Sequence, residues 1–341
     1  MFKVDYKTLK ILKHLALSRA STLFISRTEK IPQPTVYRRI ENLKRIGEVK
    51  AIPDYFKLGL RPIVVFTDIK RSKSMLFYDL KFAKVIKSGS CRNFIFLALP
   101  YESCRHYIKT LLSRLPETRI QFSFTPFSWR PDLQFLEVRN RILQVLWGKL
   151  YRHIIETEEE PAILEPSPPM KFDKKDLFIL KELEEDGLQS LREIARKLGT
   201  YPELISYHYK RHVSKIITGY RLNFPITPRG TPWRLVEVKS SNREGLIKVT
   251  LFFMKTPWLI YGFPLRDEFS VLAILVVPFY EEESLFRALS LLEDAGVVEE
   301  WHHVGYIEKR EYAEKSIPVH LFKKKKWIDV TDEVVVEYAS R

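Results

Sequence analysis

Residues 33–50 carry side chains that could contact the bases and the phosphates of a nucleic acid. Apolar residues recur at helical spacing from position 36 to position 43, so the polar residues between them face away from that stripe. Arginine can fork onto guanine and glutamine onto adenine, while flanking basic residues suit phosphates. The candidate base-reading residues are Gln33, Thr35, Tyr37 and Arg38. The candidate phosphate-binding residues are Arg39, Lys44, Arg45 and Lys50, and a solvated helix face is the alternative for the whole set.

A second segment, residues 202–215, offers a comparable but less basic helix. Its matching positions are Glu203, Ser206, Tyr207, Lys210 and Arg211. His208 and His212 stand four residues apart on one helix face, which makes them a candidate metal pair. No third Cys, His or carboxylate follows at a ligand-like spacing, so the sequence predicts no metal site and no cofactor.

The motifs of the common enzyme classes are missing from the sequence. Its 12 glycines form no G-x-G-x-x-G, no G-x-x-x-x-G-K-[ST] and no G-x-S-x-G. The acidic cluster at residues 281–283 is typical of a helix N-terminus, where negative charge stabilises the helix dipole. We therefore expect no catalytic residues, and the sequence predicts that the protein is not an enzyme.

The net positive charge is concentrated in the first half of the 341 residues. Residues 1–170 hold 30 Lys plus Arg against 16 Asp plus Glu, whereas residues 171–341 hold 27 against 26. This asymmetry favours a polyanionic partner, and inside a cell nucleic acid is the commonest one. Only two cysteines occur, Cys91 and Cys104, and neither a signal-peptide pattern nor a run of 18 apolar residues is found. We expect a cytoplasmic protein without membrane contact.

Two segments 168 residues apart begin alike. VDYKTLKILKHL from Val4 and FDKKDLFILKEL from Phe172 share seven of twelve residues, which indicates an internal duplication. Each is followed by two further helical stretches, the order of a helix-turn-helix, and then by β-prone residues at 48–52 or 216–222 that could form a wing. A proline-rich acidic segment, residues 158–170, is typical of a linker.

The remainder of each half predicts a β-α-β-β-α-β order. In the first half we expect strands at 61–69, 84–88, 93–99 and 119–124, with helices near 75–82 and 102–115. In the second half we expect strands at 234–238, 249–254, 270–277 and 298–307, with a helix at 281–295. One long helix is expected over 133–155, followed at the C-terminus by a basic turn at 323–326 and an extra edge strand.

The predicted fold is α+β, with two tandem copies of a winged helix-turn-helix followed by a ferredoxin-like βαββαβ domain. The first winged helix-turn-helix is placed at residues 1–56 and the first ferredoxin-like domain at 57–130. The long helix and linker occupy 131–170. The second winged helix-turn-helix is placed at 171–224, and the second ferredoxin-like domain with its C-terminal extension at 225–341.

This arrangement resembles the Lrp/AsnC family of archaeal and bacterial transcription regulators. The residues that carry the resemblance are Asp5 with IL at 11–12, TVYRRIENLKRIGEVK at 35–50, Asp173 with IL at 179–180, and LREIARKLG at 191–199. The resemblance implies dimers bound to double-stranded DNA, so one chain with two copies would be either a homodimer subunit or a built-in pseudo-dimer. The family's effector position, a glycine followed by an acidic residue, is approached only by Gly262 with Asp267.

The function favoured by the sequence is sequence-specific DNA binding by a transcription regulator, chiefly through the basic N-terminal recognition helix. One alternative is a winged-helix adaptor that binds RNA or a protein of the transcription or translation machinery. A less favoured alternative follows from the resemblance, because some relatives built from the same pair of domains are siroheme decarboxylases. For that reaction the first half would offer only Arg92, Arg105 and His106.

Overall fold

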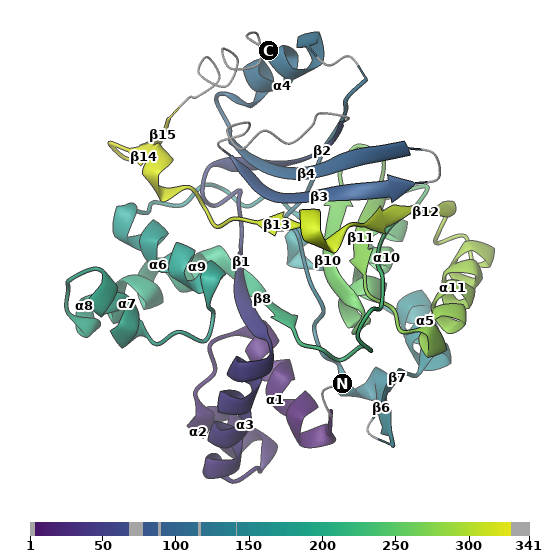
Figure 1. The fold of residues 1–341 in the computed structure, drawn as a ribbon, viewed down its shortest axis with the longest axis horizontal. Coiled ribbons are helices and arrows are strands. Elements are labelled where there is room, and N and C mark those ends of the chain that lie inside the picture. Colours follow the sequence, from purple (N-terminus) through teal and green to yellow (C-terminus); the bar gives the residue numbers. More distant parts are fainter. Residues whose placement is uncertain (1–3, 68–77, 88–89, 115–116, 141, 329–341) are drawn as a thin grey trace.

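The computed structural model describes residues 4–67, 78–87, 90–114, 117–140 and 142–328. Two small helical units and a two-stranded ribbon lie beside a large β-rich body (Figure 1). Helix-capping residues and the spacing of apolar residues in the sequence explain why these parts form.

The first helical unit is a bundle of three helices, α1 (Tyr6–Leu17), α2 (Thr22–Glu29) and α3 (Gln33–Ile46). Side-chain caps begin the first two helices, because Asp5 accepts from the Thr8 amide and Ser21 accepts from the Phe24 amide. The apolar faces of the three helices meet in one core formed by Leu9, Leu12, Ile25, Val36 and Leu43.

The second helical unit repeats this order with α6 (Lys174–Glu185), α7 (Leu191–Lys197) and α8 (Pro202–His208). A capping box formed by Ser190 and Glu193 begins α7, and Asp173 with Asp176 forms another at the start of α6. After α8 the chain continues through a π-helical turn, η3 (Tyr209–Val213), and a last short turn of helix, α9 (Ser214–Ile216).

The ribbon joins the two helical units through strands that follow them in the chain. Strand β1 (Glu48–Pro53) pairs antiparallel with β8 (Ile217–Asn223). Helix α6 packs against β1, and α1 packs against β8, so each unit covers the strand that follows the other unit. The approach is close, because the Gly187 amide donates to the Val49 carbonyl at 2.6 Å and a Cβ on Gly219 would lie 3.1 Å from the Ala16 carbonyl oxygen.

The β-rich body is one nine-stranded sheet to which both halves contribute. The first half supplies β2 (Leu60–Thr67), β3 (Asp79–Lys87), β4 (Ser90–Pro100) and β5 (Arg119–Phe122). The second half supplies β9 (Trp233–Lys239), β10 (Leu259–Leu265), β11 (Ser270–Leu275), β12 (Glu300–Ile307) and β13 (Ala313–Glu314). The order is β10-β11-β9-β12-β3-β4-β2-β5, with β13 beside β3, so the β12–β3 pair connects the halves.

The sheet curls until its two outer strands meet. Bridges between Ser123 and Leu265 and between Phe127 and Gly262 join the chain after β5 to β10. Phe94 on β4 and Phe263 on β10 are not on neighbouring strands, yet their ring centroids lie 5.2 Å apart across the interior. The enclosed core is therefore shared by both halves of the chain.

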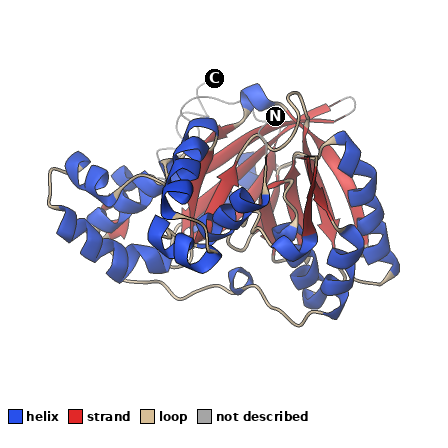
Figure 2. Ribbon diagram, turned by 90° about the horizontal axis from the view of Figure 1, so that it is seen from below, coloured by secondary structure: helices blue, strands red, loops and turns tan. Residues whose placement is uncertain are grey.

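Helices cover the outside of the sheet (Figure 2). These are α4 (Cys104–Arg114), α5 (Trp147–Glu156), α10 (Arg243–Lys255) and α11 (Phe279–Asp294), and α5 packs on both α10 and α11. The acidic cluster falls in the first turn of α11, where Glu281 accepts from the Trp147 indole at 2.6 Å. The short elements are η1 (Leu133–Phe135), β6 (Leu136–Arg139), β7 (Ile142–Val145), η2 (Ala162–Leu164), η4 (Lys309–Glu311), η5 (Val319–Leu321), β14 (Phe322–Lys323) and β15 (Lys326–Trp327).

Two of the expected elements are wrong. The strand expected at 249–254 lies inside α10, whose apolar residues are buried on every side between the sheet and α5, so no helical period shows in the sequence. The long helix expected over 133–155 is a β6–β7 hairpin followed by α5. Asn140 in that hairpin has a φ of 50°, a left-handed conformation that breaks a helix and that asparagine tolerates.

Two further expectations are met in part. The basic turn at 323–326 is the β14–β15 connection, where Lys324 and Lys325 both have positive φ. The extra edge strand after it lies outside the described residues, as does most of the helix expected near 75–82, whose remaining residues belong to β3. The mixed α+β class is confirmed. No helix in the described part of the chain is long and apolar enough to cross a membrane.

Candidate nucleic-acid interface and the cavity behind it

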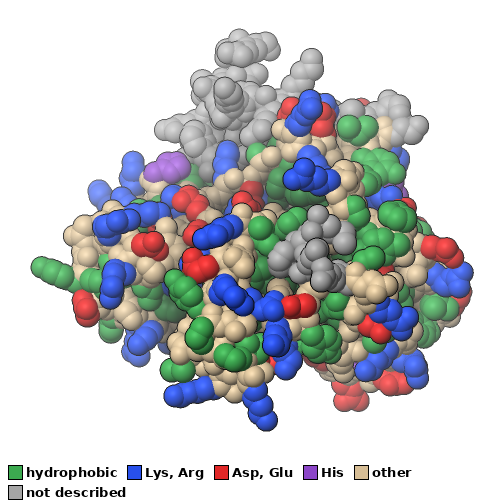
Figure 3. Space-filling model, turned by 60° about the horizontal axis from the view of Figure 1, so that its bottom comes forward, with side chains coloured by type: hydrophobic (Ala, Val, Ile, Leu, Met, Phe, Trp, Pro, Cys, Tyr) green, Lys and Arg blue, Asp and Glu red, His purple; other side chains and the backbone are tan. Residues whose placement is uncertain are grey.

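Helix α3 presents the predicted base-reading residues on its solvent side. Gln33, Tyr37 and Arg38 are exposed, with 60 % of Tyr37 accessible, and Thr35 is half-buried. The Gln33 amide lies 3.4 Å from the Thr22 hydroxyl of α2. Lys and Arg side chains stand over the helical units in Figure 3, with Asp and Glu side chains among them. The solvent side of α3 therefore carries three of the four predicted residues as exposed side chains.

The predicted phosphate-binding residues have different surroundings. Arg45 is exposed, and Lys44 is exposed beside Glu41 at 2.9 Å. Arg39 instead turns back to α1, where its two terminal nitrogens donate to the Asp5 carboxylate at 2.8 and 2.7 Å. Lys50 lies on β1 and faces the interior of the molecule rather than the exposed side of α3.

The Arg39–Asp5 pair braces α3 against α1. Burial raises the pKa of Asp5, but hydrogen bonds from Thr8 and Arg39 outweigh that effect, and the pKa lies below its ordinary value. Arg39 also donates to the Thr8 hydroxyl at 2.6 Å. Because both of its terminal nitrogens donate within the unit, we assign Arg39 a positioning role and do not carry it forward as a phosphate contact.

Helix α8 and the turn that follows it expose the second predicted set. Glu203, Tyr207, Lys210 and Arg211 are exposed, and Ser206 is half-buried. Arg192 and Arg196 on α7 add positive charge to the same unit. The second unit thus carries a basic surface although its half of the chain is nearly neutral.

A carboxylate that sequence spacing could not reveal lies between the two histidines of this unit. The His208 Nδ1 atom is 2.8 Å from one Asp176 oxygen, and the His212 Nδ1 atom is 3.3 Å from the other. Asp173 approaches His208 at 4.0 Å, so an acid–histidine group forms at the start of α6. Both aspartates also accept amide hydrogens in the capping box, which makes the group a brace between α6 and α8.

A cavity of about 690 Å³ lies behind the ribbon. Its walls come from β1, α6, the near end of the sheet and the segment after β13. Four lysines line it, Lys50, Lys81, Lys181 and Lys315, together with aromatic side chains such as Tyr55 and Tyr261. Among these residues only Lys50 was a candidate from the sequence, because their positions are spread over more than 260 residues of the chain.

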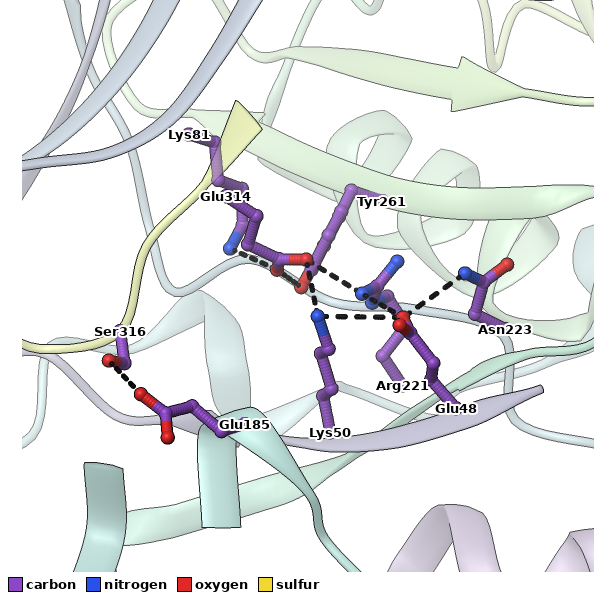
Figure 4. A network of polar contacts seen from close by, with 9 residues as sticks. All are labelled: Glu48, Lys50, Lys81, Glu185, Arg221, Asn223, Tyr261, Glu314 and Ser316. Atoms are coloured by element: carbon purple, nitrogen blue, oxygen red, sulfur yellow. Dashed lines mark hydrogen bonds and ion pairs between the residues drawn. The ribbon is translucent and has the colours of Figure 1, made fainter. Parts of the chain in front are cut away.

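The carboxylate of Glu314 is held at one wall of this cavity by four donors (Figure 4). One oxygen accepts from Lys81 at 3.0 Å and from the Tyr261 hydroxyl at 2.5 Å. The other accepts from Arg221 at 2.7 Å and from Lys50 at 3.4 Å. Burial raises the pKa of Glu314, but the charges of Lys81 and Arg221 outweigh it and hold the pKa far below the ordinary range.

A second carboxylate at the cavity, Glu184 on α6, has the opposite environment. Burial raises its pKa to about 8, although the Ile317 amide donates to it at 2.8 Å and Lys81 lowers it. At neutral pH this group is therefore mostly protonated. The cavity thus keeps a positive surplus, with Glu314 and the exposed Glu185 as its charged acids.

The remaining sequence candidates lie elsewhere. Arg105 and His106 are exposed at the start of α4 on the outside of the sheet, and Arg92 is exposed on β4. Gly262 faces the Phe127 ring where the sheet closes, and Asp267 lies 3.4 Å from the Phe122 amide in the same region. Cys104 is buried, and burial raises the pKa of its thiol. None of these residues lines the cavity.

Comparison with known proteins identifies one sequence match and one fold match. Residues 172–211, which form α6 to the start of η3, match the family described as winged helix-turn-helix DNA-binding. No curated protein matches the sequence significantly.

The fold match extends along the whole chain. Two solved structures of the siroheme decarboxylase NirDL, one of them in co-complex with an iron-uroporphyrin III analogue, are similar at a TM-score of 0.51 and 11 % identity. The match covers 98 % of this chain and 99 % of that one. The match overturns the expectation that the protein is not an enzyme, because a known enzyme has the same complete architecture. At 11 % identity the similarity shows the fold alone.

Proposed function

We propose that the protein binds double-stranded DNA through its two helical units, with α3 as the principal base-reading helix. The observation that carries this proposal is the open face of α3, where Gln33, Tyr37 and Arg38 are exposed while the apolar side is buried. The DNA-binding family match to the second unit supports the same role for α8. Arg38 would fork onto a guanine, and Lys44 with Arg45 would hold phosphates.

The pairing of β1 with β8 supports an intrachain pseudo-dimer. It ties the two recognition helices into one body, much as a dimer interface ties the helices of two subunits. We propose that each half is a copy of a winged helix-turn-helix followed by a ferredoxin-like domain, in the manner of the Lrp/AsnC regulators. The strand orders β3-β4-β2-β5 and β10-β11-β9-β12 correspond between the halves, which supports this reading.

The test is a selection of bound sequences from a random duplex pool by the full chain. Affinity for the selected duplex and for a scrambled one is then measured across a salt series. We expect one motif and a specificity ratio of roughly a thousand or more. Arg287→Ala, at an exposed arginine on α11 outside both units, is the control and should change neither affinity.

Motif-free binding with a steep salt dependence would contradict base reading and favour an RNA or architectural role. Absence of duplex binding would favour a protein-binding adaptor.

A second candidate is an enzyme that acts on a carboxylated tetrapyrrole such as siroheme. Two observations favour it, the fold match over the full chain and the lysine-lined cavity of about 690 Å³. Incubation with siroheme under anaerobic conditions, followed by absorption spectra and product analysis, tests it. A spectral shift with loss of carboxyl groups supports the enzyme, and an unchanged spectrum and substrate rejects it.

A further inference from the structure

Two cations face each other across the ribbon. Lys50 on β1 and Arg221 on β8 are direct partners in the antiparallel register. Like charges at opposed positions of a strand pair repel each other, so this pair needs a negative group between them. Glu48 is near, at 3.4 Å from Lys50 and 3.8 Å from Arg221, but its side chain is half exposed to solvent. The buried group that reaches both cations is the Glu314 carboxylate.

Glu314 does not belong to the ribbon. It stands at the end of the two-residue strand β13, which pairs with β3, and its other oxygen accepts from Lys81 on β3 and Tyr261 on β10. Four donors from four strands therefore converge on one carboxylate that arrives on a separate segment. Such a convergent, buried donor set is the usual construction of a site for a carboxylate.

The space beside this carboxylate is large enough for a ligand. The cavity of about 690 Å³ lies within the range of small-molecule sites, roughly 300–1,000 Å³. Tyr55, Phe178 and Ile317 contribute apolar and aromatic surface to its lining, together with the four lysines. Because Glu184 is mostly protonated at neutral pH, it does little to cancel the positive charge. A molecule that fits this lining has a flat apolar body and an acidic group.

We propose that the cavity binds a small molecule with a flat apolar body and at least one carboxylate, which replaces the Glu314 carboxylate on Lys50, Lys81, Arg221 and Tyr261. Two of these donors stand on the ribbon strands. The exchange therefore acts directly on the pair that holds the two helical units together. This last consequence, a ligand effect on DNA affinity, rests on the proposed DNA-binding function.

The first test measures ligand binding by the full chain without DNA. The probes are 1-pyrenebutyrate and 1-pyrenebutanol, which share the aromatic body and differ in the carboxylate, followed by fluorescence at neutral pH. We expect the acid to bind about tenfold more tightly than the alcohol, a difference typical of one charge-assisted hydrogen-bond set. Equal affinities for the two probes would overturn the proposal.

Two substitutions at the site sharpen this test. Glu314→Gln removes the internal competitor and should raise the affinity for the acid about tenfold, with little change for the alcohol. Lys50→Met keeps Glu314 and its three other donors and should lower the affinity for the acid several-fold. Glu308→Gln, which removes a carboxylate paired with Lys84 on the outside of the sheet, is the matched control and should change neither.

Unchanged acid affinity in Glu314→Gln would overturn the replacement of Glu314. If that variant fails to fold, Lys50→Met decides alone, and unchanged affinity there overturns the site.

The second test adds the duplex selected above. Saturating 1-pyrenebutyrate should change the affinity of the chain for this duplex at least threefold, whereas 1-pyrenebutanol should not. Acid binding with unaltered DNA affinity would overturn the coupling. The two proposals fail separately, because the probe titration contains no DNA and the selection contains no probe.

Discussion

The two helical units hold their third helix against their first helix with different side chains. In each, a carboxylate at the start of the first helix holds the recognition helix, Asp5 with Arg39 in one unit and Asp176 with His208 in the other. Asp5 is half exposed and its partner is an arginine, whereas Asp176 is only 1 % exposed and its partners are two histidines. The first brace is an accessible ion pair, and the second is part of the core.

In both units the residues that anchor the third helix differ from those proposed to read bases. In α3 the neighbours Arg38 and Arg39 divide the work, because one faces solvent and the other faces α1. In the second unit histidines do the anchoring, and the exposed cations Lys210 and Arg211 stay available. The following predictions test that division, and the substitutions in the two units are ordered by expected effect.

The largest effect is expected from Asp176→Ala. It removes a buried carboxylate that caps α6 and holds both histidines, so the second unit should lose about 3 kcal/mol of stability. The equivalent loss of an exposed cap in Asp5→Ala should cost the first unit about 1 kcal/mol. Hydrogen exchange of the α8 and α3 amides measures both, with the exposed Glu203→Ala as control. Equal losses of stability in Asp176→Ala and Asp5→Ala would contradict the difference between the two units.

Arg38→Ala should weaken binding to the selected duplex by about 1–3 kcal/mol and leave binding to random duplex nearly intact. Lys210→Ala in the second unit should weaken both duplexes similarly, since a lysine beside a phosphate carries no base information. Titrations of both variants against both duplexes check this. A uniform loss in Arg38→Ala would reject its base-reading role.

Arg39→Ala should act mainly on stability. Because the Arg39–Asp5 pair is partly exposed, its loss should cost about 1 kcal/mol or less, seen as a lower urea midpoint for the first unit. Non-specific DNA affinity should stay within twofold, since the guanidinium does not face outward. A loss of DNA affinity larger than that of Lys44→Ala would return Arg39 to the phosphate contacts.

A separate prediction concerns pH. Glu184 on α6 has a pKa raised to about 8, whereas the residue 168 positions earlier, Ala16 on α1, is uncharged. Between the ordinary glutamate pKa near 4.5 and about 8, the folded chain holds this proton more firmly than the unfolded chain. This contribution to stability is therefore complete below pH 4.5 and is lost as pH rises toward 8.

Urea unfolding from pH 5 to 8 measures this loss. Glu184→Gln should flatten the decline, and the exposed neighbour Glu185→Gln should not. An unchanged slope in Glu184→Gln would contradict the raised pKa.

The helical units could be predicted from sequence because their signals are local. Caps at Asp5, Asp173 and Ser190 and apolar residues at helical spacing place the helices within a few residues. The exposure of Gln33, Tyr37 and Arg38 followed from the same spacing. The strand expected at 249–254 failed because a helix buried on all sides shows no period, and the 133–155 helix failed at the Asn140 turn.

The cavity could not be predicted, since its residues meet only through long-range pairing. Lys81, Arg221, Tyr261 and Glu314 stand on four strands, and no spacing in the sequence connects them. Lys81 is one of three lysines on β3, so its position in the strand does not distinguish it from Lys84 and Lys87. The brace at Asp176 was missed for the same reason, because its partner His208 lies 32 positions away.

At the ribbon, α1 packs on β8 and α6 packs on β1, so each unit needs a strand from the other half of the chain. This arrangement affects how the protein folds while it is being synthesised. When the first unit has left the ribosome, the strand that will cover α1 is not yet made, and it is completed only with Asn223. The nascent first unit therefore keeps an apolar face uncovered while some 170 further residues are translated. Separate expression of the halves should give two aggregation-prone fragments that become soluble when they are produced together.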